Sequence, residues 1–177
     1  PTLASIVKYP YESVLATRQK FGFFQSEKMN YRFIARELQI PAKERDPDEY
    51  VRYPLVFLVE AADDICYQIM DLEDACKLGI LSHDKVKELY MGFYDPVVDK
   101  EGIRKIDTVL KRVTDKNEQI SFLRAGVIGK LVRESMAVFF DHYEDIMTGV
   151  YDSSLIRNLG KKQDEAMQEV IKVSFSD

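Results

Sequence analysis

The fold is decided by residues 51–78, which read VRYPLVFLVEAADDICYQIMDLEDACKL. Apolar residues recur there at intervals of three and four, the spacing that places side chains on one face of an α-helix. Gly79 follows directly, and glycine is the residue that most often ends a helix. The stretch therefore predicts a helix of about 28 residues, a length typical of a central rod in a large helical bundle.

The same periodicity continues over most of the chain, and no long stretch alternates with a period of two, so we expect an all-α fold. Ser82 and Gly149 are expected to mark a helix start and a helix end. The remaining expected helices cover residues 2–8, 26–38, 84–93, 102–113, 117–147 and 162–173. The expected connections are an aromatic loop over residues 19–27, a loop with two prolines over residues 40–50 and a turn over residues 152–155.

Length and charge narrow the class of protein. The 177 residues, 46% of them hydrophobic, suffice for one core, so residues 1–177 are expected to form a single all-α unit. A net charge of −5 does not indicate a nucleic-acid partner, and no apolar run is long enough to predict a membrane span. Two cysteines within one predicted helix favour a reducing, cytoplasmic location over a disulfide framework. The chain begins at Pro1 inside an apparent helix, which suggests part of a longer polypeptide.

The long helix carries an unusual polar stripe. Asp63, Tyr67 and Asp71 are spaced four residues apart and so lie on one face of the helix. Buried carboxylates require a cation or hydrogen bonds, so two of them along an otherwise apolar helix indicate a binding site. The alternative is an ordinary acidic face turned to solvent, and spacing alone leaves both interpretations open.

Residues 52–75, RYPLVFLVEAADDICYQIMDLEDA, resemble the signature of the deoxyguanosine triphosphate triphosphohydrolases, which belong to the HD superfamily of metal-dependent phosphohydrolases. The resemblance extends to TLASIVKYP at residues 2–10 and KFGFF at residues 20–24, and more weakly to ISFLRAGVIGKLV at residues 120–132 and the FFDHYEDIMTG that follows. It implies an HD-domain-like helical bundle, of which this chain would be the incomplete C-terminal portion.

The resemblance also implies roles for individual residues. Asp63 matches the aspartate that helps to hold a divalent ion. Tyr67 matches a tyrosine that packs against the deoxyribose, and Asp71 matches an aspartate that bonds the sugar 3′-hydroxyl. Lys8 and Tyr9 match a pair that reaches the triphosphate and the substrate. These five residues are the predicted site.

Arg124 is a weaker candidate, for a contact with the phosphates. The family's other metal ligands, a histidine and a His-Asp pair, precede the segment at which this chain begins. His83-Asp84 follows Ser82 and is better explained as a capped helix start, and His142 as a polar residue on a helix face. The chain would thus supply one ligand where a catalytic metal needs three or more, so we expect no activity, and no bound metal, from the chain alone.

Two functional hypotheses follow. In the first, the chain is part of a hydrolase of nucleotide metabolism that uses Mg²⁺ or Mn²⁺ to split dGTP, or other dNTPs, into deoxynucleoside and inorganic triphosphate, and that forms a homo-oligomer like many relatives. In the second, it is a non-catalytic all-α interaction or regulatory module whose acidic stripe is structural. The presence or absence of upstream metal ligands in the parent would discriminate between them.

Overall fold

The computed structural model describes residues 1–16 and 20–174. Within these residues the chain forms eight α-helices, three short 3₁₀ turns and one two-stranded sheet, so the prediction of a predominantly α-helical fold is confirmed. Residue contacts divide the chain into two compact units, and each is described by itself. The first comprises Pro1–Ala61 and Ala137–Leu155, and the second comprises Ala62–Met136 and the segment from Ile156 onward. The single all-α unit expected over residues 1–177 stays a prediction.

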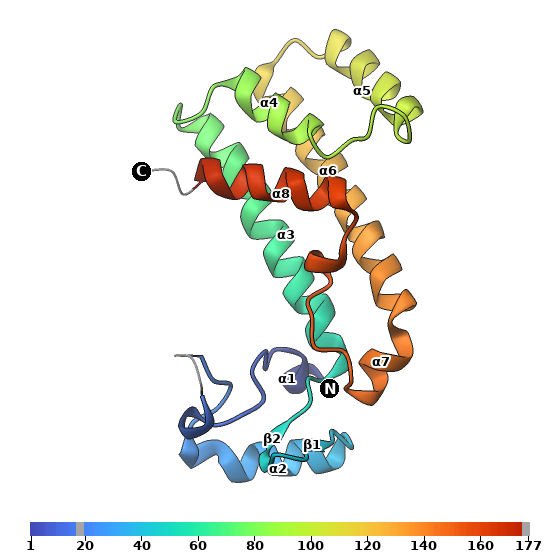
Figure 1. The fold of residues 1–177 in the computed structure, drawn as a ribbon. Helices are drawn as coiled ribbons and strands as arrows, with labels where there is room; N and C mark the ends of the chain where they lie inside the picture. Colours follow the sequence, from blue (N-terminus) through green and yellow to red (C-terminus); the bar gives the residue numbers. More distant parts are fainter. Residues whose placement is uncertain (17–19, 175–177) are drawn as a thin grey trace. The chain divides into compact units, whose positions relative to one another are not determined.

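The first unit combines short helices with a β-hairpin (Figure 1). Its elements are α1 (Thr2–Ser5), α2 (Lys28–Glu37), β1 (Ala42–Lys43), β2 (Asp46–Tyr50), the start of α3 (Pro54–Lys77), the end of α6 (Lys116–Asp141) and α7 (Tyr143–Thr148). The two strands pair antiparallel, with Ala42 opposite Tyr50 and Lys43 opposite Asp46. The loop predicted over residues 40–50 is therefore wrong. In a sheet of two strands both are edge strands, and an edge strand tolerates the proline at position 47.

An aromatic cluster forms the core of the first unit. The Tyr31 ring stacks on Phe23 at 4.5 Å between centroids and meets Tyr50 edge-on at 5.2 Å. Burial raises the pKa of the Tyr31 hydroxyl to about 12. Within the aromatic segment predicted as a loop, residues 25–27 form a 3₁₀ turn and Phe23 is buried, whereas residue 19 lies outside the described residues. The other buried members of this core are Ala4, Ala35 and Ile40.

The second unit is built from helices. Most of α3 and α6 belongs to it, together with α4 (His83–Met91), α5 (Lys100–Arg112) and α8 (Lys161–Ser174), and α8 packs against α4 (Figure 1). Ile65, Ile69 and Leu72 on the inner face of α3 are at most 1% exposed. The buried Tyr90 hydroxyl on α4 donates a hydrogen bond of 2.9 Å to the carbonyl of Ile69, which fixes α4 on α3. These contacts confirm that the apolar periodicity of residues 51–78 faces a core.

The helix ends follow local sequence signals in most places. The Ser82 hydroxyl accepts a hydrogen bond of 3.2 Å from the backbone N–H of Lys85 and so caps α4, as predicted. Gly79 and Gly149 end their helices with φ of 73° and 78°, a left-handed conformation that favours glycine. A Cβ added at Gly149 would also lie 2.7 Å from the Cβ of Val51.

The second long helix differs from its prediction. Instead of running from residue 117 to residue 147, α6 ends at Asp141 and α7 begins at Tyr143, with His142 between them at φ −107° and ψ 19°. The His142 ring lies 4.9 Å from the ring of Tyr151. This tertiary contact accompanies the break, and periodicity along the helix does not encode it. None of the described helices is both long enough and apolar enough to cross a membrane.

Candidate functional site

The predicted stripe lies on the outer face of α3. Asp63, Tyr67 and Asp71 are all exposed, and the Tyr67 side chain keeps 61% of its surface accessible. Because neither carboxylate is buried here, the energetic argument that buried charges demand a ligand does not apply to this chain. The three side chains are nevertheless presented together, on the face opposite the buried Ile65 and Ile69.

Glu73 on the same helix behaves differently, because it is only 3% exposed. Its carboxylate accepts a hydrogen bond of 2.6 Å from the Ser121 hydroxyl and forms ion pairs with Lys77, at 3.1 Å, and with Arg124. Burial alone would raise the pKa of Glu73, but the hydrogen bonds from Ser121 and Lys77, with the charges of Arg124 and Lys77, hold it below its ordinary value. Arg124, the candidate phosphate contact, is therefore engaged with Glu73 in this structure.

Asp63 is the one residue for which the resemblance implies a metal-binding role. In the part of the chain that the structure describes, no three His, Cys, Asp or Glu side chains are grouped so that they could hold an ion. His83 is the first residue of α4, directly after its Ser82 cap, so the interpretation of His83-Asp84 as a helix start is confirmed. Within the described residues, Asp63 is thus a single candidate ligand and does not by itself make a metal site.

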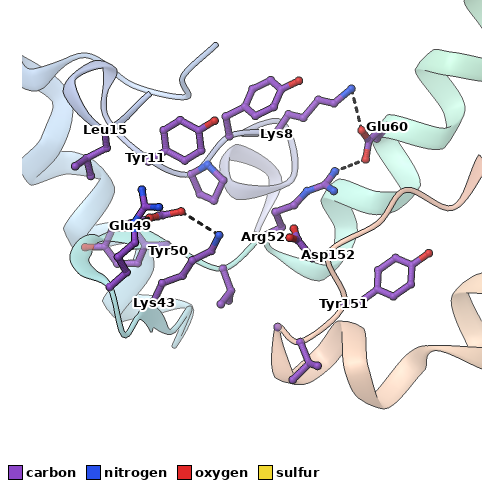
Figure 2. Close-up of a pocket in the computed structure, with 16 residues that line it drawn as sticks. Lys8, Tyr11, Leu15, Lys43, Glu49, Tyr50, Arg52, Glu60, Tyr151 and Asp152 are labelled. Atoms are coloured by element: carbon purple, nitrogen blue, oxygen red, sulfur yellow. Dashed lines mark hydrogen bonds and ion pairs between the residues drawn. The ribbon is translucent and has the colours of Figure 1, made fainter. Parts of the chain in front are cut away.

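Lys8 and Tyr9 follow α1 in the first unit and line a pocket of about 520 Å³ (Figure 2). The Lys8 ammonium lies 2.9 Å from the carboxylate of Glu60 on α3. The Tyr9 ring lies 6.2 Å from the ring of Tyr11 and has the Lys20 ammonium over it at 5.9 Å from the centroid. Both tyrosine rings are partly buried, and a pocket that combines a cation with aromatic rings suits an anionic ligand with a flat or sugar-like part.

Glu60 connects Lys8 to a second cation, Arg52, and Figure 2 shows both side chains reaching its carboxylate. The Glu60 side chain is 10% exposed, and burial by itself would raise its pKa. The hydrogen bonds from Arg52 and Lys8 outweigh burial, so the pKa lies below its ordinary value and the group is a carboxylate at neutral pH. The Arg52 guanidinium also lies over the Phe57 ring at 4.3 Å from the centroid.

The opposite part of the pocket comes from the hairpin. Glu49 on β2 pairs with Lys43 at 3.0 Å and with Arg45 at 3.5 Å. Sequence reasoning placed this segment in a loop and missed Arg52, Glu60 and the hairpin charges as pocket residues. The available signal was their mixed charge, seven charged residues among positions 43–52, but nothing local indicated which charges would converge.

Comparison with curated proteins finds relatives that match most of the chain. A deoxyguanosinetriphosphate triphosphohydrolase-like protein of Synechocystis is 36% identical over 166 residues, which cover 88% of this chain and 35% of the relative. A protein of the same description from Pseudomonas aeruginosa is 29% identical over 163 residues, covering 89% of this chain and 35% of the relative. The chain is homologous to deoxyguanosinetriphosphate triphosphohydrolases.

A further triphosphohydrolase homologue, from Cronobacter sakazakii, is 28% identical over 151 residues, covering 79% of this chain and 28% of the relative. The chain thus spans about a third of the length of these curated relatives. No protein-family model matches it. The homology confirms the resemblance recognised in residues 52–75, while the roles of the individual site residues stay predictions.

Proposed function

We propose that the chain is the C-terminal portion of a dNTP triphosphohydrolase that converts dGTP, or another dNTP, into deoxynucleoside and inorganic triphosphate. The observation that carries this proposal is the presentation of Asp63, Tyr67 and Asp71 on one exposed face of α3. The Cronobacter sakazakii relative is named a deoxyguanosinetriphosphate triphosphohydrolase, and this name supports the substrate class.

The order of side chains on that face suits a nucleotide. Positions four residues apart rise by about 6 Å along a helix, so an oxygen ligand, an aromatic ring and a hydrogen-bond acceptor follow one another at roughly the spacing of a phosphate and its sugar. Asp63 would face the metal and the α-phosphate, Tyr67 would pack against the deoxyribose, and Asp71 would accept a hydrogen bond from the 3′-hydroxyl. Since all three are exposed, they can meet a ligand without disturbing the core behind them.

Other residues of the chain would serve the phosphates. Lys8 would contribute a mobile positive charge, and Tyr9 a ring beside it. Arg124 would have to exchange part of its contact with Glu73 for a phosphate oxygen, which its 30% side-chain exposure allows.

A divalent ion, Mg²⁺ or Mn²⁺, would polarise the α-phosphate and lower the pKa of the attacking water when bound to the longer protein. Asp63 is the ligand that this chain would contribute, and the histidine ligands would come from residues that the sequence does not contain. Assembly as a homo-oligomer and a cytoplasmic location belong to the same proposal.

The test replaces Asp63 with alanine in the longer parent protein and measures release of inorganic triphosphate from each dNTP in the presence of Mn²⁺ or Mg²⁺. Activity should fall to background, because the metal loses a ligand. Asp107→Ala is the matched control, since Asp107 is an exposed acid on a different helix, α5, and the variant should retain near wild-type turnover. Turnover by Asp63→Ala equal to that of Asp107→Ala would refute the assignment of Asp63, and a parent without any triphosphate release would favour a non-catalytic interaction or regulatory module.

A further inference from the structure

The pocket in the first unit contains two charge clusters of the same composition. In each, one carboxylate with little exposed surface lies between two cations: Glu60 between Lys8 and Arg52, and Glu49 between Lys43 and Arg45. The exposed fractions of the two carboxylate side chains are 10% and 12%, so both depend on their cations for stabilisation. In Figure 2, Glu60 lies on α3 with Arg52 and Lys8 beside it, and Glu49 and Lys43 lie on the hairpin.

The pocket is more positive than the chain around it. Its lining holds four cations against three carboxylates, the third being Asp152, which leaves a formal charge of 4 − 3 = +1 in a chain of net charge −5. Each of Glu60 and Glu49 has two cationic partners among the residues that line the pocket. Nε of Arg52 is also buried without a hydrogen-bond partner, which leaves donor capacity in the same guanidinium.

We propose that this pocket binds a polyphosphate anion through both clusters, with Arg52 beside Lys8 on one side and Lys43 with Arg45 on the hairpin side. The phosphate oxygens take over part of the cation contacts that Glu60 and Glu49 make in the unliganded chain. The inference rests on the proposed function in treating Lys8 as a phosphate contact, and it adds Arg52, the hairpin cations and the two competing carboxylates. A volume of about 520 Å³ lies within the usual range for small-ligand sites.

Two features of the clusters support an anion over a cation as the ligand. Guanidinium groups such as Arg52 and Arg45 present paired N–H donors that match phosphate oxygens. Glu60, by contrast, is already engaged by Lys8 and Arg52, so a metal ion would have to displace a lysine and an arginine from the same carboxylate.

The first experiment titrates the 177-residue chain by calorimetry with inorganic triphosphate, dGTP and deoxyguanosine separately. Triphosphate and dGTP should both bind, more weakly as salt is raised, and deoxyguanosine should not. Binding of dGTP without binding of triphosphate would instead mean that the pocket reads the nucleoside, and it would overturn the proposal.

The second experiment tests the hairpin side with Lys43→Gln/Arg45→Gln. Both side chains are largely solvent-accessible, at 43% and 68%, so the variant should fold, and its affinity for triphosphate should fall at least about tenfold. Lys161→Gln/Lys172→Gln on α8 is the control, because it removes the same charge from exposed positions of the second unit. Equal affinity of the two double variants would overturn the role of the hairpin cluster.

The third experiment uses Glu60→Gln to find out whether the Glu60 carboxylate competes with phosphate for Lys8 and Arg52 or only holds these two side chains in place. If phosphate replaces the Glu60 carboxylate, removal of its charge should tighten triphosphate binding about three- to tenfold, with Glu169→Gln as the charge-matched control. A structural role alone predicts weaker binding, and that result would contradict the proposed competition. Circular dichroism of each variant checks folding, and the hairpin variant tests the site independently of position 60.

Failure of this inference is distinguishable from failure of the proposed function. The titrations measure binding to the present chain without metal or turnover, whereas Asp63→Ala is assayed by catalysis in the longer protein. Absence of triphosphate binding here would leave the Asp63 test standing, and an active Asp63→Ala enzyme would leave the pocket titrations standing.

Discussion

The helix α3 carries two kinds of carboxylate, and the difference between them separates stability from ligand binding. Glu60 and Glu73 are nearly buried, and each is held by two cations. Asp63 and Asp71 lie on the exposed face of the same helix. A buried charge that loses its partners is strongly destabilising, whereas an exposed one contributes little to folding. The exposed pair is thus available for a ligand at almost no cost in stability.

The strongest test of this comparison is Glu73→Ala. Removing the carboxylate takes away the ion-pair partner of Arg124 and the hydrogen-bond acceptor of the Ser121 hydroxyl. Nε of Arg124 is already buried without a hydrogen-bond partner. We expect a loss of about 2–3 kcal/mol in the free energy of unfolding, at the low end for buried pairs because Lys77 and Arg124 are partly exposed. Urea denaturation monitored by circular dichroism measures it. A loss below about 0.5 kcal/mol would erase the distinction between the two kinds of carboxylate.

The proposed role of Asp71 can be sharpened with a substrate that lacks its partner. In the longer protein, Asp71→Ala should lower kcat/KM for dGTP about ten- to a hundredfold, the usual effect of removing a charged hydrogen-bond acceptor. With 2′,3′-dideoxy-GTP, which has no 3′-hydroxyl, wild type and variant should be nearly equal in triphosphate release. An identical loss with both nucleotides would show that Asp71 does not contact that hydroxyl.

Acid should reveal the contribution of the two buried carboxylates, Glu60 and Glu73, to stability. The folded-state pKa values of Glu60 and Glu73 lie below the ordinary 4.5, so their contribution to stability is fully present above that pH and is lost as the pH falls through the folded values. The unfolding free energy should therefore decline from about pH 4.5 downward. The decline should be shallower in Glu60→Gln/Glu73→Gln, measured by urea titrations at successive pH values. An unchanged slope in the double variant would assign the acid transition to other groups.

The smallest expected effect concerns the folding contribution of the exposed face. Asp63→Ala and Tyr67→Ala should each change the unfolding free energy by less than about 0.5 kcal/mol, because neither side chain is part of the core. Thermal denaturation of the two variants against wild type measures the change. Ile65→Ala, on the buried face of the same helix, is the positive control and should cost about 2–5 kcal/mol. A comparably large loss at Tyr67 would mean that its ring is packed in solution.

The sequence predicted what local signals determine. The extent of α3, the Ser82 cap and the helix ends at Gly79 and Gly149 all follow from residues within one or two turns. The hairpin over residues 42–50 was missed because polar strands with a proline lack the alternation that identifies a strand.

The candidate site likewise contains residues whose proximity local sequence predicts and residues whose proximity it does not. Asp63, Tyr67 and Asp71 share a face because helical spacing requires it, so their juxtaposition was predictable. The Glu60 cluster was not, since it unites Lys8 with a helix 52 positions later, and Arg52 bonds a carbonyl at Ser153, a separation of 101 residues. Contacts of that range depend on tertiary packing, which periodicity does not describe.

The close approach of Gly149 to Val51 predicts that substitutions at position 149 disturb the pocket of the first unit. The backbone of Gly149 occupies space that even a methyl group would contest, and the residue directly after Val51 is Arg52. Any larger residue at position 149 would push the backbone segment before Asp152 away from the segment before Arg52. Substitutions that weaken the proposed anion binding are therefore expected at position 149, although the residue there has neither charge nor side chain.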